Sequence, residues 1–307
     1  MISIRNAYTG LVVASVVLLA ACGGGGGGSS DDTGGNAGGN TGGNTGGNTG
    51  GAAAIASGDE VLARAYKLNA VLAALARHQV SISGVCQTGS ASSSGSKGVT
   101  TIEYKDCSFP AFGIGLKLDG SVIFTQAAST PIGGGVTGVL NANDVAVTLG
   151  GSEQATLSGT ATLLIKSDPG QTAMDWSNAE MTFRLAGKDN KMSSGALKMV
   201  DGSQGFSISG SYQLAAQDLG ETVSLEMPAA NPLTAKPFTA FALTGEIKGS
   251  GAKGGTLSLT PISDSTVSTA IGGTTSKDAV DWLALLFPQS SSAPPGSSGA
   301  GSAPPGG

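Results

Sequence analysis

The chain has 307 residues, of which 12% are charged and 5% are aromatic, and its formal net charge is −5. Because the chain is acidic and contains no cluster of lysine and arginine, we expect no nucleic acid among its partners. Once the two ends described below are set aside, roughly 230 residues remain, enough for one ordinary domain or one large β domain.

The N-terminus has the pattern of an export signal. One basic residue, Arg5, precedes an apolar run over Leu11–Ala20. That run is much shorter than the roughly twenty residues that a helix needs to cross a bilayer. Small residues follow the run, so residues 1–21 are predicted to be a signal peptide.

The end of this segment resembles the lipobox of bacterial lipoproteins, which ends in the cysteine that becomes lipidated. The residues that carry the resemblance are Leu19, Ala20, Ala21 and Cys22, followed by Gly23. The resemblance implies that the mature chain begins at Cys22 and is anchored in the outer membrane by acyl chains such as palmitate. Stable anchoring takes more than one such chain. An ordinary signal peptide followed by an unrelated cysteine is the alternative.

Residues 22–57 are predicted to be a tether without a fold. Between Gly23 and Gly51 the chain contains no apolar residue larger than alanine. Such a composition cannot bury enough surface to offset the entropy lost on ordering. As a coil the tether would span about 30 Å on average, which would hold the domain away from the lipid headgroups. The tail over residues 289–307, rich in Ser, Ala, Pro and Gly, is predicted to be disordered as well.

The first folded element is predicted to be a helix over about Asp59–Gln79. Its apolar residues recur at three- and four-residue steps, which indicates one buried face. Ser57 and Glu60 fit a capping box, and Glu60 and Arg64 form an i,i+4 pair. The basic residues are expected on an exposed side, either as a solvated face or as a contact with anionic lipid or an acidic partner. They are Arg64, Lys67, Arg77 and His78.

His78 itself, near the helix end, is interpreted as a C-terminal cation or a surface residue.

Cys86 and Cys107 are the cysteines that remain if Cys22 is lipidated. Two thiols left over in an exported protein usually join, so we predict a disulfide between them. It would contribute on the order of 3 kcal/mol in the chain-entropy model. Since a metal site needs further ligands, we expect no metal and no cofactor.

Beyond the cysteines, apolar and polar residues alternate in about ten strand-like runs between Thr101 and Pro261, separated by Gly, Asn, Asp or Pro. No helical stretch separates these runs, which predicts an antiparallel meander. So many strands favour a strongly curved sheet or a partial barrel. The predicted fold class is therefore mainly β, with an N-terminal helix and a short C-terminal helix packed on the sheet.

Four of the runs share a short motif in which an apolar and a small polar residue precede a glycine. The glycines are Gly120, Gly159, Gly210 and Gly245. Because a glycine inside a strand commonly marks a bulge or a sharp bend, we expect these positions to curl the sheet.

A curled sheet has a concave side, and two interpretations of it are open. In one, the helix fills the concave side. In the other, part of it is left as a cavity for an apolar ligand such as a lipid. The side chains expected to line that cavity are Val122, Phe124, Leu163, Ile165 and Phe183.

The last predicted element is a short apolar helix over Asp278–Phe287, stopped by Pro288. Ser276 or Thr275 is expected to cap it. The helix has almost no polar face, so we expect it to be buried as a plug at one end of the sheet. The alternative is a docking peptide for a partner.

No pattern in the sequence indicates catalysis, and we predict no catalytic residues. A Ser-His-Asp triad would have to use the single histidine, His78, and the sequence contains no Gly-x-Ser-x-Gly motif that would supply the nucleophilic serine. We therefore predict a non-catalytic binding or structural protein of the cell envelope, with its domain in the periplasm or on the cell surface. Its partners would be the membrane, through the lipid, and an envelope protein or an apolar ligand. A carrier of a small apolar ligand and a surface-displayed adhesin are the alternative functions.

Overall fold

The computed structural model describes residues 57–82, 84–128, 134–272 and 274–288. All of them belong to one compact unit of the chain, Asn48–Gly307. The signal segment, Cys22, most of the tether and the tail over residues 289–307 lie outside the described residues, so the predictions for them stay predictions.

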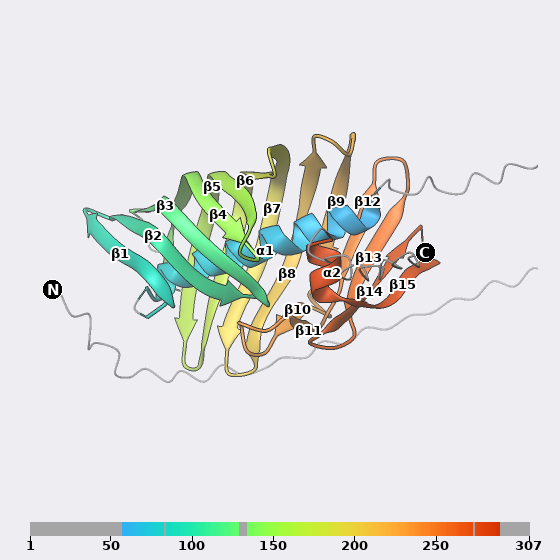
Figure 1. The fold of residues 1–307 in the computed structure, drawn as a ribbon. Coiled ribbons are helices and arrows are strands. Elements are labelled where there is room, and N and C mark those ends of the chain that lie inside the picture. Colours follow the sequence, from blue (N-terminus) through green and yellow to red (C-terminus); the bar gives the residue numbers. More distant parts are fainter. Residues whose placement is uncertain (1–56, 83, 129–133, 273, 289–307) are drawn as a thin grey trace, which may run out of the picture. The chain divides into compact units, whose positions relative to one another are not determined.

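The described chain is mainly β, with a long helix before the strands and a short one after them (Figure 1). The helices are α1, Gly58–Val80, and α2, Trp282–Leu286. The first nine strands are β1 (Thr88–Ser96), β2 (Val99–Ala111), β3 (Ile114–Gln126), β4 (Val136–Leu149), β5 (Glu153–Asp168), β6 (Gln171–Leu185), β7 (Lys188–Gly202), β8 (Gly205–Ala216) and β9 (Glu221–Met227). The later strands are β10 (Leu233–Ala235), β11 (Ala242–Thr244), β12 (Ile247–Gly251), β13 (Thr256–Pro261), β14 (Thr266–Ile271) and β15 (Thr274–Asp281).

These strands form one antiparallel sheet of 15 strands that is not closed into a barrel. Strands β1 to β9 pair in sequence order, and β12 to β15 continue the sheet from β9. The short β10 pairs with β8 and β11 instead. The predicted antiparallel meander with two terminal helices is confirmed. Strand β1 is not predicted by the alternation of apolar and polar residues, because its nine residues are all Thr, Gly, Ser or Ala.

A line of bends crosses the sheet from β2 to β8. In β2, β4, β6 and β7 one extra residue reverses the alternation of buried and exposed side chains, and the pairing register shifts at the same level. Such an extra residue is a β-bulge, which bends the strand and increases its twist. The bulged residues have positive φ and are Asp106, Asp144, Asn178 and Ser194.

Glycines occupy the same line in the strands between the bulges, and all four glycines predicted to bend the sheet have positive φ. The backbone of the neighbouring strand approaches two of them closely. A Cβ on Gly159 would lie 2.2 Å from the carbonyl oxygen of Glu180, and one on Gly210 would lie 2.1 Å from that of Ala196. The expectation that strand glycines mark bends is therefore confirmed for Gly120, Gly159 and Gly210, whereas Gly245 lies between β11 and β12 and belongs to neither strand.

Helix α1 crosses the concave face of the sheet (Figure 1). Near its start, the Asp59 carboxylate lies 2.6 Å from Lys277 in β15, and near its end His78 contacts Tyr104 in β2. Of its 23 residues, 18 are buried, on every side of the helix. The prediction of one buried face and one exposed basic side is therefore wrong, because chain segments cover the helix on the side away from the sheet as well.

The cover consists of α2, the turn between β2 and β3, and the segment between β10 and β11. Tyr66 of α1 donates its hydroxyl to the carbonyl of Phe112, 3.2 Å away, and accepts from the amide of Ala242 at 3.0 Å. The Phe112 amide in turn donates to the carbonyl of Phe238 at 2.8 Å. Trp282 of α2 packs on the Tyr66 ring, with 4.7 Å between the ring centroids. These contacts enclose the middle of the helix.

The C-terminal helix is shorter than predicted. Asp278 to Asp281 belong to β15, in which Val280 and Asp281 pair with β14. Asp281 is the N-cap, and its carboxylate accepts from the amides of Leu283 at 2.8 Å and Ala284 at 3.1 Å. The prediction of Ser276 or Thr275 as the cap is wrong, since strand pairing extends past both. Trp282, Leu285 and Leu286 are buried as expected, whereas Leu283 is exposed.

Candidate functional site

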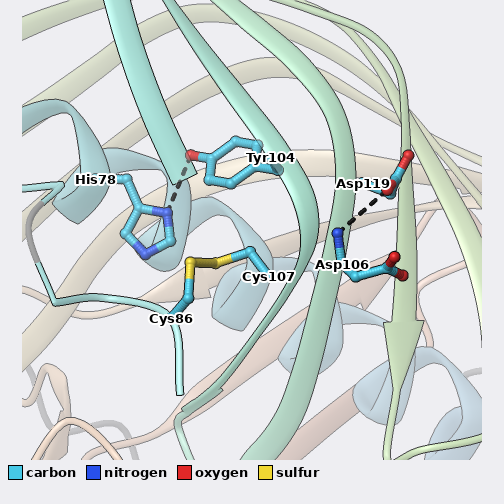
Figure 2. The surroundings of a disulfide bond; sticks show 6 residues. All are labelled: His78, Cys86, Tyr104, Asp106, Cys107 and Asp119. Atoms are coloured by element: carbon cyan, nitrogen blue, oxygen red, sulfur yellow. Dashed lines mark hydrogen bonds between the residues drawn. A yellow bond between two sulfur atoms is a disulfide. The ribbon is translucent and has the colours of Figure 1, made fainter. Parts of the chain in front are cut away.

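The segment after α1 is joined to β2 by a disulfide between Cys86 and Cys107 (Figure 2). The two Cα atoms are 5.1 Å apart, and Cys107 is fully buried. The amide of Gln87 also donates to the carbonyl of Ser108 at 2.7 Å. The predicted disulfide is therefore present, and it fixes the chain where it leaves the helix.

His78 lies beside this disulfide and is buried, with 3% of its surface exposed (Figure 2). Its Nδ1 lies 3.0 Å from the hydroxyl of Tyr104, and its ring packs edge-on against Phe109. Burial, and to a lesser degree the neighbouring Arg77, lowers the pKa of His78 to about 4. The interpretation of His78 as a C-terminal cation or surface residue is therefore wrong, because it is neutral and internal at neutral pH.

Arg64 is buried as well, with 4% of its surface exposed. Its guanidinium donates to both carboxylate oxygens of Asp218 at 2.7 Å and to the side-chain oxygen of Asn190 at 2.9 Å. The predicted pair with Glu60 is also formed. The Arg64 guanidinium holds the pKa of Asp218 well below its usual range. This cluster attaches the first half of α1 to the turn after β8.

Lys67 forms the second buried cation of the helix, also 4% exposed. Its ammonium lies 2.6 Å from a carboxylate oxygen of Glu153 and 4.6 Å from the centre of the Phe287 ring. Burial lowers the pKa of Lys67, although Glu153 opposes the shift. Arg64 and Lys67 therefore contact protein carboxylates, and the predicted basic face toward lipid or an acidic partner is absent from this part of α1.

The predicted capping box is also wrong. Ser57 has a left-handed backbone with φ of 61°, and its side chain makes no cap hydrogen bond. Glu60, the other half of the box, instead receives a bond from Arg64. A tertiary ion-pair cluster has replaced the local capping interaction.

The five side chains named for an apolar cavity lie on strands β3, β5 and β6. Val122, Phe124, Leu163 and Phe183 belong to the same buried core cluster as α1, and Ile165 packs partly buried against it. The cavities at the start and at the end of α1 are lined by other residues. The structure thus packs these five side chains into the core around the helix.

A cavity of about 420 Å³ lies between the start of α1, α2 and the turn after β6. Its walls combine the buried cations Arg64 and Lys67 with apolar residues such as Leu185 and Leu286. Each cation already faces a protein carboxylate. These ion pairs therefore fix the helix to the sheet. The one signal for them in the sequence is the pair of cations, Arg64 and Lys67, three residues apart in an otherwise apolar helix.

Within the described ranges, no group of three or more His, Cys, Asp or Glu side chains is arranged to hold a metal ion. Neither helix in the part of the chain placed by the structure has both the length and the hydropathy needed to span a membrane. In comparisons with known proteins, no protein family, curated protein or solved structure matches this chain.

Proposed function

We propose that this chain is a lipid-anchored protein of the bacterial cell envelope, held in the outer membrane through acyl chains on Cys22. A β-rich domain would stand on a slack tether in the periplasm or on the cell surface. The domain would bind or support another envelope component and would not catalyse a reaction. The resemblance of residues 19–22 to a lipobox is the sequence basis of this proposal.

The observation that carries the proposal is the disulfide. The chain has three cysteines, and the structure pairs Cys86 with Cys107. Disulfides persist in exported proteins and are rare in the cytosol. The pairing supports export and leaves Cys22 as the one cysteine available for lipidation.

The arrangement of α1 supports a binding or structural role. The helix is enclosed by the sheet and by the covering segments, and one buried and two partly buried polar contacts fix it in place. A helix held in this way suits a module that presents a fixed surface to a partner.

The test is mass spectrometry and membrane fractionation of the native chain beside a Cys22→Ser variant. We expect the native N-terminal peptide to begin at an acylated Cys22, and the variant to leave the membrane fraction. A double variant, Cys86→Ser with Cys107→Ser, is the matched control and should stay in the membrane. A Cys22→Ser chain that remains membrane-bound with residues 1–21 attached would contradict the proposal.

A further inference from the structure

A second cavity, of about 320 Å³, lies at the C-terminal end of α1. Its volume is at the lower end of the range for small-molecule sites. The lining residues that matter for the argument are Arg77, His78, Ser81, Gln87, Phe109 and Phe238.

The imidazole of His78 is the buried polar group in this cavity. Tyr104 is 2% exposed, and its hydroxyl lies 3.0 Å from Nδ1 of His78. Both buried groups are satisfied when Tyr104 donates to Nδ1, and in the neutral ring the proton then resides on Nε2. Nε2 has no hydrogen-bond partner among the described residues, and Figure 2 shows it on the side of the ring away from Tyr104.

The other polar groups of the cavity favour an anion. Arg77 is positively charged, and among the described residues that line the cavity none is acidic. Its Nε donates to Asp201 at 2.9 Å, which leaves the two terminal nitrogens of the guanidinium as further donors. The Ser81 hydroxyl and the side-chain amide of Gln87 belong to residues that line the same cavity, and they add neutral donors.

The remaining walls are apolar and aromatic. Phe109 and Phe238 are 5% and 7% exposed, and the Arg77 guanidinium lies over the Phe238 ring at 4.7 Å. The parts of these two rings that stay exposed can contact the apolar body of a small ligand. The disulfide at Cys86 joins the adjoining segment to β2, which restrains this wall of the cavity.

We propose that this cavity binds a small carboxylate with an apolar or aromatic body. The carboxylate accepts a hydrogen bond from Nε2–H of His78 and pairs with the guanidinium of Arg77. The apolar body lies against Phe109 and Phe238. This site is separate from the lipid anchor, so it does not rest on the proposed lipidation.

The chain offers a direct readout, because His78 is its only histidine and gives one set of imidazole NMR signals. The full-length chain with Cys22→Ser, exported so that the disulfide forms, is titrated with 3-phenylpropionate to about 10 mM. We expect a saturable shift of the His78 signals. The neutral analogue 3-phenylpropionamide should bind at least about tenfold more weakly, because it lacks the charge.

Arg77→Gln tests the second contact, and Arg184→Gln is the matched control. Both arginines pair with an aspartate of a neighbouring segment, but Arg184 lies away from the cavity. We expect Arg77→Gln to weaken binding of 3-phenylpropionate at least about fivefold, and Arg184→Gln to leave it unchanged. The absence of a saturable His78 shift, equal binding of acid and amide, or unchanged binding in Arg77→Gln would each overturn the proposal.

Discussion

His78 shows how one buried side chain links stability to pH. In the folded chain its pKa is lowered from 6.5 to about 4, mainly by burial. Between these values the unfolded chain binds more protons than the folded chain, so the free energy of unfolding falls as the pH falls. The free energy of unfolding is therefore not reduced by His78 above about pH 6.5, and it is reduced progressively as the pH falls from there toward 4.

We predict that lowering the pH from 7.5 to 5 reduces the free energy of unfolding by about 2 kcal/mol through His78. This window lies above the range in which most carboxylates titrate. Urea unfolding at several pH values measures the change. A His78→Gln variant cannot titrate and should lose this dependence, and a dependence equal to that of the unchanged chain would contradict the assignment.

Arg64 is a second buried side chain on which the stability of the fold depends, through its ion pairs and hydrogen bonds. Its removal leaves the side-chain oxygen of the fully buried Asn190 without its donor. It also takes one of two cations from the partly buried Asp218, which keeps Lys188 at 2.7 Å. Leaving a buried acceptor unsatisfied costs about 1–3 kcal/mol.

We therefore expect Arg64→Met to lower the free energy of unfolding by about 2 kcal/mol, measured by urea denaturation. Arg184→Met is the control, because Arg184 pairs with Asp189 at the surface, with 59% of its side chain exposed. That variant should change stability little, since its charges stay in water. An equal decrease in the free energy of unfolding in the two variants would show that the buried position of Arg64 does not make its contacts more stabilising than those of Arg184.

At the scale of the strands, the line of bulges and glycines gives the sheet its curvature. Carboxylates of adjoining strands satisfy two of the bulges. Asp119 accepts from the amide of Asp106 at 3.2 Å, and Glu180 accepts from the amide of Ser194 at 3.0 Å. The bends are therefore part of the hydrogen-bond network, and at Gly159 and Gly210 the backbone of the next strand leaves no room for a side chain.

Gly210→Ala is predicted to cost at least about 2 kcal/mol of stability. Its φ of 121° is strained for an L side chain, and the new Cβ would meet the carbonyl of Ala196. Thermal or urea unfolding checks this. Gly115→Ala in β3 is the control, because no atom lies within 4 Å of its added Cβ. Similar stability of the two variants would remove the structural reason given for glycine in the bend.

At the scale of the whole domain, α1 is the element around which the open sheet curves. Leu68, Leu72 and Leu75 are completely buried, and they belong to one core cluster with the strands. By contrast, β1 is an edge strand whose residues are almost all exposed. Buried central elements open only with the whole domain, and exposed edges open locally.

We expect native-state hydrogen exchange to separate these two elements. The amides of residues 68–76 should exchange only through global unfolding, with the free energy that denaturation gives for the domain. The amides at the outer edge of β1 should exchange much faster. Comparable exchange rates in α1 and β1 would contradict the view that the helix is the centre of the core.

Local patterns were sufficient to predict most of the long strands, the meander and the disulfide, whereas β1, β10, β14 and β15 lie outside the predicted runs. Alternation predicts strands because side chains point to opposite faces in turn, and antiparallel pairing follows from short connections. The strand glycines predicted the bends at Gly159 and Gly210, since these φ values exclude most other residues. Once Cys22 is assigned to the predicted lipid anchor, the two remaining cysteines have one possible intramolecular pairing.

The sequence by itself therefore determined the fold class, the order of the elements and the cysteine pairing, all of which depend on near neighbours or on a single choice. The tertiary structure alone decided that α1 is covered on every side, and hence that Arg64, Lys67 and His78 are internal. Helical periodicity records the spacing of apolar residues and not how many surfaces cover a helix. The partners that accommodate these three groups, Asp218, Glu153 and Tyr104, are 154, 86 and 26 residues away along the chain, and only folding brings them into contact.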